Sequence, residues 1–262
     1  MCYRSCMIKR VYQGIARRLA RYKRDWRKPV LERRTQVPIV QPVVFDTIPH
    51  DPKAFTQGLI YQDGRLFESA GLYGASSLRQ MKPDGTIVRR IDLPDIFAED
   101  ITIFNGELVQ LTWRENKALR YSLPSLKEKG VFRYTGEGWG LTSTQDHFIM
   151  SNGGGTLLIR EKSFKTIEKL RVKLDGRLVN GINALEHVHG KIYANTWRSH
   201  FILEIDLRSG SVLRILDCSE LIGIEEPRTP DSMLNGIAHC GDGDFFYLAG
   251  KCWKNIFLVK FP

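Results

Sequence analysis

From residue 40 onward, the chain consists of short runs in which hydrophobic and polar residues alternate or β-branched residues cluster. Turn-forming pairs such as Asp-Gly, Asn-Gly and His-Gly interrupt these runs at short intervals. Alternation with a period of two is typical of β-strands, and these pairs are typical of hairpin turns. We therefore expect many β-hairpins and few helices in this part of the chain.

The turns recur at a regular spacing. Asp63, Asn105, Asp146 and His189 open four similar phrases and are 42, 41 and 43 residues apart. Each phrase reads turn, strand, loop, strand, turn and strand, and a fifth phrase, which opens at Asp242, stops one strand short. A repeat of about 40 to 45 residues with four strands is typical of a β-propeller blade.

The strand that the fifth phrase lacks is available near the N-terminus, in residues 42–48 (PVVFDTI). This strand precedes the first phrase in the same position in which the strand TIVRRIDL precedes the second phrase. We therefore predict an all-β fold, a five-bladed β-propeller closed by an N-terminal strand that completes the last blade and leaves only short edges open. A long β-sandwich is the alternative, although a sandwich does not require a regular repeat.

The net charge of +10 arises entirely from residues 1–36, which hold twelve Lys and Arg residues and two acidic ones. The remaining residues hold 27 basic and 27 acidic side chains. Hydrophobic residues recur every three or four positions within residues 1–36, which predicts a basic amphipathic helix that ends at Pro29; a disordered extension is the alternative. We therefore divide the chain into a basic N-terminal arm, residues 1–36, and a propeller domain, residues 37–262.

The arm could contact an anionic membrane or a partner protein peripherally, or direct the protein to an organelle. Basic residues interrupt it too often for a cleavable secretory signal, and no apolar run is long enough for a transmembrane helix. The five cysteines lack C-x-x-C spacing, which favours a reducing compartment. We expect a cytoplasmic or peripherally membrane-associated monomer. We expect no nucleic-acid binding, because no aromatic-lined groove or known motif accompanies the basic charge.

Two classes of loop place unusual residues at one end of the predicted propeller. The first class of loop joins the outermost strand of one blade to the innermost strand of the next. The second class follows the second strand of each blade, which is the next strand along the chain. Both classes open to the same end because the two strands between them are antiparallel. The first class contains Phe55, Gln57, Phe97, Glu99, Glu137, Trp139, Asn183, Glu186 and Asn235, and the second contains Glu68, Trp113, Trp197, Lys251 and Trp253.

In this alignment, Trp139 corresponds to Gln57, Glu99 and Asn183. Any one of these aromatic residues could simply fill space between blades. Aromatic and polar residues that converge at one end are, however, the usual lining of a small-ligand pocket. The set as a whole therefore favours a pocket, with Trp139 as part of its wall.

The motifs FTQGL, LYGxSSLR, FxE, QLTW, GEGWGL, NxLE, ANxW and GKxW occur in this order within residues 43–262. With these motifs, the chain resembles the plant and bacterial type of glutaminyl-peptide cyclotransferase, or glutaminyl cyclase. The resemblance implies a five-bladed propeller enzyme, an acyltransferase of the aminoacyl type, that converts the N-terminal glutamine of peptides or proteins to pyroglutamate and releases ammonia without a cofactor. A catalytically inactive propeller that binds peptides or scaffolds partners is the alternative.

The resemblance places these residues in the pocket, and the chemistry of cyclisation suggests a role for each as a hypothesis. Glu99 would take a proton from the substrate amine and return it to the leaving nitrogen, and Lys251 would stabilise the oxyanion. The side-chain amides of Gln57 and Asn183 would orient the substrate amide. The predicted aromatic cage consists of Phe55, Phe97, Trp113, Trp139 and Trp197.

Two residues depart from the family pattern: Ala98 stands in FAED where FGEG is usual, and Ala184 replaces the first acid of NELE. We expect no metal site, because His187 and His189 lack a third ligand at suitable spacing.

Overall fold

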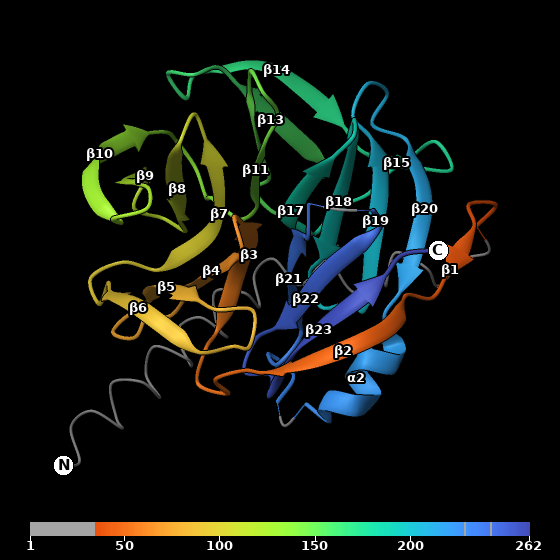
Figure 1. Ribbon diagram of the computed structural model, residues 1–262. Coiled ribbons are helices and arrows are strands. Elements are labelled where there is room, and N and C mark those ends of the chain that lie inside the picture. Colours follow the sequence, from red (N-terminus) through yellow and green to blue (C-terminus); the bar gives the residue numbers. More distant parts are fainter. Residues whose placement is uncertain (1–34, 228, 242) are drawn as a thin grey trace. The chain divides into compact units, whose positions relative to one another are not determined.

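The computed structural model of the protein describes residues 35–227, 229–241 and 243–262. Residues 1–34 of the predicted basic arm lie outside the described part of the chain. The described residues form strands almost throughout, with one short helix (Figure 1).

Five β-sheets are arranged around a central axis as the blades of a propeller (Figure 1). The first blade consists of β3 (Thr56–Gln62), β4 (Arg65–Ala70), β5 (Ser77–Met81) and β6 (Ile87–Asp92). The second consists of β7 (Ala98–Phe104), β8 (Glu107–Thr112), β9 (Lys117–Ser122) and β10 (Lys127–Arg133). The third blade consists of β11 (Leu141–Ser143), β12 (Phe148–Met150), β13 (Thr156–Arg160) and β14 (Thr166–Arg171). The fourth consists of β17 (Ile182–Val188), β18 (Lys191–Thr196), β19 (Phe201–Asp206) and β20 (Val212–Asp217). The fifth consists of β21 (Leu234–His239), β22 (Phe245–Gly250), β23 (Asn255–Lys260) and β2 (Val43–Pro49).

The first strand of each repeat lies nearest the axis. The strands β3, β7, β11, β17 and β21 contact one another in turn around the ring, and β21 closes the ring against β3. Their ends therefore surround one channel, so that side chains far apart in the sequence can meet there.

The N-terminal strand closes the propeller as predicted. β2 pairs antiparallel with β23, from Val43 opposite Lys260 to Pro49 opposite Asn255. A second N-terminal strand, β1 (Ile39–Val40), pairs parallel with β20 of the neighbouring blade. The sequence did not predict β1, because two residues are too few to show a pattern.

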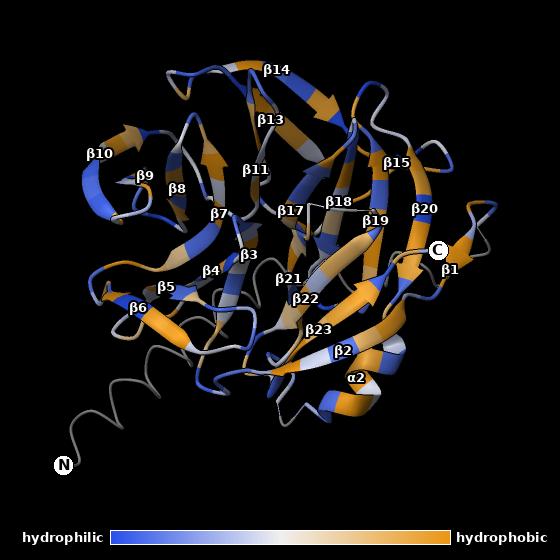
Figure 2. Cartoon of the chain, in the orientation of Figure 1, coloured by the Kyte–Doolittle hydropathy of each residue, from blue (hydrophilic) through white to orange (hydrophobic). Residues whose placement is uncertain are grey.

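Hydrophobic residues pack between neighbouring blades, and hydrophilic residues occupy many of the turns (Figure 2). Phe67 of the first blade and Leu108 of the second share one such layer, and Leu111 of the second and Phe148 of the third share the next. Each blade thus buries both faces against its neighbours, and burial of apolar surface is what holds the ring together.

Two elements interrupt the repeat. The helix α2 (Ser219–Glu225) follows β20, and its Leu221 is buried in the layer between the fourth and fifth blades. A small hairpin, β15 (Lys173–Leu174) and β16 (Arg177–Leu178), follows the third blade. Within the described residues, no helix has the length and apolar character needed to cross a membrane.

Candidate active site

The same backbone hydrogen bond recurs at one end of every blade. An amide just after the second strand donates to a carbonyl just before the first, at 2.7–2.9 Å. The five donor–acceptor pairs are Gly71–Phe55, Trp113–Phe97, Ser151–Gly140, Trp197–Gly181 and Lys251–Met233. Trp113, Trp197 and Lys251 are therefore structural equivalents, whereas Trp253 lies two positions further on and is buried.

A β-bulge follows this hydrogen bond in four of the five innermost strands. The bulges shift the register between Thr56 and Gly58, Ala98 and Ile101, Ile182 and Leu185, and Leu234 and Ile237. A bulge inserts an extra residue that re-aims a side chain, and bulges are frequent beside active sites. The residues within these bulges include Gln57, Glu99, Asn183 and Asn235, and all four are buried.

The third blade departs from this pattern, and the sequence alignment at Trp139 was wrong. The residue two positions after Gly140 is Thr142, so Thr142 is the counterpart of Gln57, and β11 pairs with β12 without a bulge. Trp139 precedes Gly140 and reaches the same end of the channel from the loop. The error arose because only the observed hydrogen bonds define the register of such a short strand.

Aromatic side chains from four blades form an almost continuous chain of contacts at this end. The ring centroids of Phe55 and Phe97 lie 6.3 Å apart, and those of Phe97 and Trp113 lie 5.3 Å apart. The rings of Trp139 and Trp197 meet edge to face at 6.1 Å. The structure thus brings together the five aromatic residues that the sequence singled out.

Glu137 joins the two halves of this aromatic chain. Its Oε2 accepts hydrogen bonds from Nε1 of Trp113 at 3.0 Å and from Nε1 of Trp139 at 3.1 Å. The same carboxylate forms an ion pair with Arg114 at 2.9 Å, and the Arg114 guanidinium lies 3.5 Å from the centroid of the Trp113 ring. The sequence showed Glu137 in GEGWG but gave it no role, because nothing in the sequence indicates that both indoles point toward it.

The ring of Trp139 lies directly against the backbone of Gly153. A Cβ atom on Gly153 would stand 2.8 Å from the indole carbons, and φ at this glycine is +80°. A larger residue would therefore both strain the backbone and displace the indole. The glycines near this tryptophan leave room for the ring as well as forming turns.

Lys251 and Glu99 place opposite charges in this aromatic setting. Nζ of Lys251 lies 4.7 Å from the centroid of the Phe55 ring, a cation–π contact, and both charged residues are buried. Burial raises the pKa of the Glu99 carboxyl well above its usual value, although the Lys251 ammonium opposes the shift. Burial lowers the pKa of Lys251, although Glu99 opposes that shift in turn. Each group therefore stands nearer to its neutral form than it would in water.

The three buried amides at the bulges offer polar groups to a ligand. Nδ2 of Asn235 donates to Oε1 of Gln57 at 2.8 Å, which fixes the Gln57 side chain with its NH₂ group free to point elsewhere. Oδ1 of Asn183 is buried and accepts no hydrogen bond from the described residues. A buried acceptor without a partner is uncommon in folded proteins and costs about 1–3 kcal/mol.

No group of three or more His, Cys, Asp or Glu side chains among the described residues is arranged to hold a metal ion. The polar side chains gathered at this end of the channel are the carboxyl groups of Glu99 and Glu137, the amine of Lys251 and side-chain amides, beside an aromatic wall.

Comparison with known proteins identifies the family. The family model for glutamine cyclotransferase matches residues 18–261. The chain belongs to the glutamine cyclotransferase family. Its relatives include a glutaminyl-peptide cyclotransferase of Arabidopsis thaliana, 33% identical over 219 residues that cover 81% of this chain and 68% of the relative. A crystal structure of glutaminyl cyclase from Myxococcus xanthus superposes with a TM-score of 0.81 at 34% identity, covering 86% of this chain and 98% of the other.

The two departures from the pattern of glutamine cyclotransferases lie beside the bulge residues. Ala98 is the first residue of β7 and is fully buried. Its backbone amide donates a hydrogen bond to Oγ of Ser76 at 3.1 Å. Ala184 follows Asn183 within the bulge of β17 and is also buried. Glu99 and Asn183 themselves lie in the bulges at the channel end of β7 and β17.

Proposed function

We propose that this protein is a glutaminyl-peptide cyclotransferase that converts the N-terminal glutamine of peptides or proteins to pyroglutamate and releases ammonia. It is thus an acyltransferase of the aminoacyl type. The observation that carries the proposal is the burial of Glu99 and Lys251, from the second and fifth blades, in electrostatic contact behind the aromatic residues. Membership of the glutamine cyclotransferase family supports the same conclusion.

The reaction needs little beyond positioning and proton transfer. The unprotonated α-amino nitrogen attacks the carbon of the side-chain amide, the carbonyl oxygen gathers negative charge, and the amide nitrogen leaves as ammonia with one added proton. Since nucleophile and electrophile belong to one residue, holding the side chain folded back supplies much of the rate. The aromatic wall formed by Phe55, Phe97, Trp113, Trp139 and Trp197 suits the aliphatic part of the folded glutamine and excludes water.

Glu99 acts in this proposal as the base that takes the amine proton and as the acid that returns it to the leaving nitrogen. A carboxyl whose pKa is raised by burial holds and releases a proton nearer to neutral pH, which suits both steps. Lys251 stabilises the oxygen anion, and a buried ammonium does so more strongly than a solvated one. Gln57 and Asn183 orient the substrate amide through their side-chain amides, which lie at the bulges of the first and fourth blades.

A catalytically inactive propeller is not favoured, because both charged residues are retained and buried together. The test is incubation of the full chain with a Gln-initiated peptide and with the same peptide acetylated at its N-terminus. Mass spectrometry should show loss of one ammonia molecule from the free peptide only. Binding of the free peptide without this loss would favour the inactive alternative.

We propose that the protein acts as a monomer, that it binds no nucleic acid, and that the basic arm, residues 1–36, provides a peripheral contact with an anionic membrane or a partner. Sedimentation of the full chain with anionic and with neutral vesicles, at low and at high salt, measures the membrane contact.

A further inference from the structure

The loop that carries Lys251 joins β22 to β23 and is held by neighbours on both sides. The Lys251 amide donates to the Met233 carbonyl at 2.8 Å, and the Cys252 amide donates to the Ala54 carbonyl at 2.7 Å. Glu225 of α2 accepts from the Lys254 amide at 2.7 Å. These contacts fix the backbone of the loop from which the Lys251 side chain extends.

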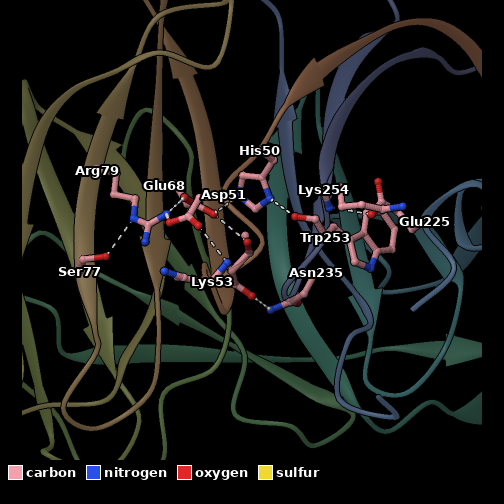
Figure 3. A network of polar contacts seen from close by, with 11 residues as sticks. His50, Asp51, Lys53, Glu68, Ser77, Arg79, Glu225, Asn235, Trp253 and Lys254 are labelled. Carbon is pink, nitrogen blue, oxygen red and sulfur yellow. Dashed lines mark hydrogen bonds and ion pairs between the residues drawn. The ribbon is translucent and has the colours of Figure 1, made fainter. Parts of the chain in front are cut away.

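His50, at the end of the closing strand β2, provides a further contact that holds this loop (Figure 3). Its Nδ1 lies 2.9 Å from the Trp253 carbonyl oxygen, and its backbone amide donates to the Lys254 carbonyl at 2.8 Å. Its Nε2 lies 2.8 Å from Oε1 of Glu68, on β4 of the first blade. The imidazole therefore connects the Lys251 loop to the adjoining blade.

The partners of the imidazole determine its protonation. A carbonyl oxygen can only accept, so Nδ1 must carry a hydrogen. Glu68 also receives the Thr56 hydroxyl at 2.7 Å and faces the Arg79 guanidinium at 3.4 Å, so it is ionised and Nε2 must donate to it as well. With both nitrogens as donors, His50 is an imidazolium.

The surrounding charges balance this cation. Glu68 of β4 carries one negative charge, Arg79 of β5 carries a positive one, and Asp51, beside His50, pairs with Arg79 at 3.1 Å (Figure 3). Burial opposes the charge on both members of the His50–Glu68 pair, but their mutual attraction and hydrogen bond prevail. The pKa of His50 is thereby raised, and that of Glu68 is lowered to about 2.

We propose that the protonated imidazole of His50, held by Glu68, is a positioning residue for Lys251 in the cyclisation reaction. The proposal rests on the proposed function, since it assigns His50 a part in that same reaction. His50 touches no substrate in this arrangement and acts only through the Trp253 and Lys254 carbonyls. When the imidazole loses its proton, it can no longer donate to both the Trp253 carbonyl and Glu68, so the connection from the loop to the adjoining blade is broken and the Lys251 ammonium is held less firmly.

The first experiment is a double-mutant cycle between His50→Gln and Lys251→Ala in the full chain. We expect His50→Gln alone to lower kcat by about tenfold or more, since small displacements of a catalytic group are costly, with KM changed by less than about twofold. In the Lys251→Ala background, His50→Gln should have little further effect on the residual turnover, because its target has been removed. Equal effects of His50→Gln in both backgrounds would show a general structural role and would overturn the proposal.

The second experiment uses pH with Glu68→Gln, which keeps the shape of residue 68 but removes its charge. Burial lowers the pKa of His50 and Glu68 raises it, so the variant should release the His50 proton at lower pH than the wild type. Burial and Arg79 then leave the pKa of His50 in the variant below its ordinary value of 6.5, so the ratio of variant to wild-type kcat should fall as pH rises toward 6.5. A ratio that is constant with pH would contradict the proposal.

Two controls keep the outcomes distinct. His147→Gln alters a histidine in the turn between β11 and β12, at the opposite end of the strands, and should leave kcat unchanged. Nitrogen NMR of the wild-type protein reads the protonation of His50 directly, and a neutral imidazole at neutral pH would refute the proposal even if neither variant folds. If the wild-type protein cyclises no Gln-initiated peptide, the proposed function itself fails; if it does so and the cycle is additive, only the role of His50 fails.

Discussion

Burial acts against both charges of the Glu99–Lys251 pair, and each group only partly offsets the pKa shift that burial causes in the other. A pair of this kind is a poor contribution to stability, because desolvation offsets much of the Coulombic attraction. Its location behind aromatic side chains is more readily explained by chemistry, since strongly perturbed pKa values concentrate at functional sites.

Replacement of Glu99 by Gln keeps the shape of the side chain and removes its ability to take a proton. We expect the variant to fold normally and to lose about 100-fold or more in kcat on a Gln-initiated peptide. Ammonia release followed by mass spectrometry, with circular dichroism for the fold, measures both. Turnover close to that of the wild type would remove Glu99 from the mechanism.

Replacement of Trp139 by Ala removes the ring that faces Trp197. It also removes one of the two indole N–H groups that donate to Glu137. We expect KM to rise and kcat to fall, because the substrate side chain loses one wall and its folded geometry is held less firmly. Steady-state kinetics measure both parameters. If neither changes, the tryptophan only fills space between blades.

At the scale of single elements, the β-bulges explain why the site lies at one end of the channel. Strands β3, β7, β17 and β21 each carry a bulge beside the recurring backbone hydrogen bond. At the other end of β17, half-buried Glu186 accepts the His239 amide of β21 at 2.9 Å, so one strand contributes Asn183 to the site and a polar link to the next blade.

The link between β17 and β21 makes stability depend on pH. Burial raises the pKa of Glu186 to about 8, so the folded protein keeps a proton that the unfolded chain releases at lower pH. The contribution of Glu186 to stability therefore falls as pH rises from about 4.5 to about 8.

Glu186→Gln keeps the acceptor oxygen but cannot ionise. We therefore expect its stability relative to the wild type to increase across this pH range, as measured by urea unfolding at several pH values. Glu168→Gln, at an exposed position of β14, should show a constant difference, and the same constant difference for Glu186→Gln would contradict the prediction.

At the scale of the whole propeller, Asp100 connects several blades near the axis. It belongs to β7 of the second blade, and its Oδ2 accepts the Leu141 amide of the third blade at 2.8 Å and the Leu185 amide of the fourth at 2.9 Å. Gly58 of the first blade lies against it so closely that a Cβ atom there would stand 2.2 Å from Oδ1. Four of the five blades thus meet at one carboxyl group.

Asp100→Ala leaves the Leu141 and Leu185 amides buried without their acceptor. We expect the free energy of unfolding to fall by roughly 3 kcal/mol or more, since each unsatisfied buried group costs about 1–3 kcal/mol. Urea unfolding measures the change. Asp146→Ala, in the exposed turn between β11 and β12, is the control and should change stability by less than about 0.5 kcal/mol.

The sequence by itself determined the five blades, the closing strand and the residue types at the channel end, because strand alternation and turn pairs are local patterns that repeat along the chain. It also carried the family resemblance, and with it the candidates Glu99 and Lys251. Only the tertiary structure decided the register at Trp139, the role of Glu137 and the link from His50 to Glu68. These depend on how neighbouring blades meet once the ring has closed, and contacts between blades are set by packing and by the bulges, which leave no regular trace in the sequence.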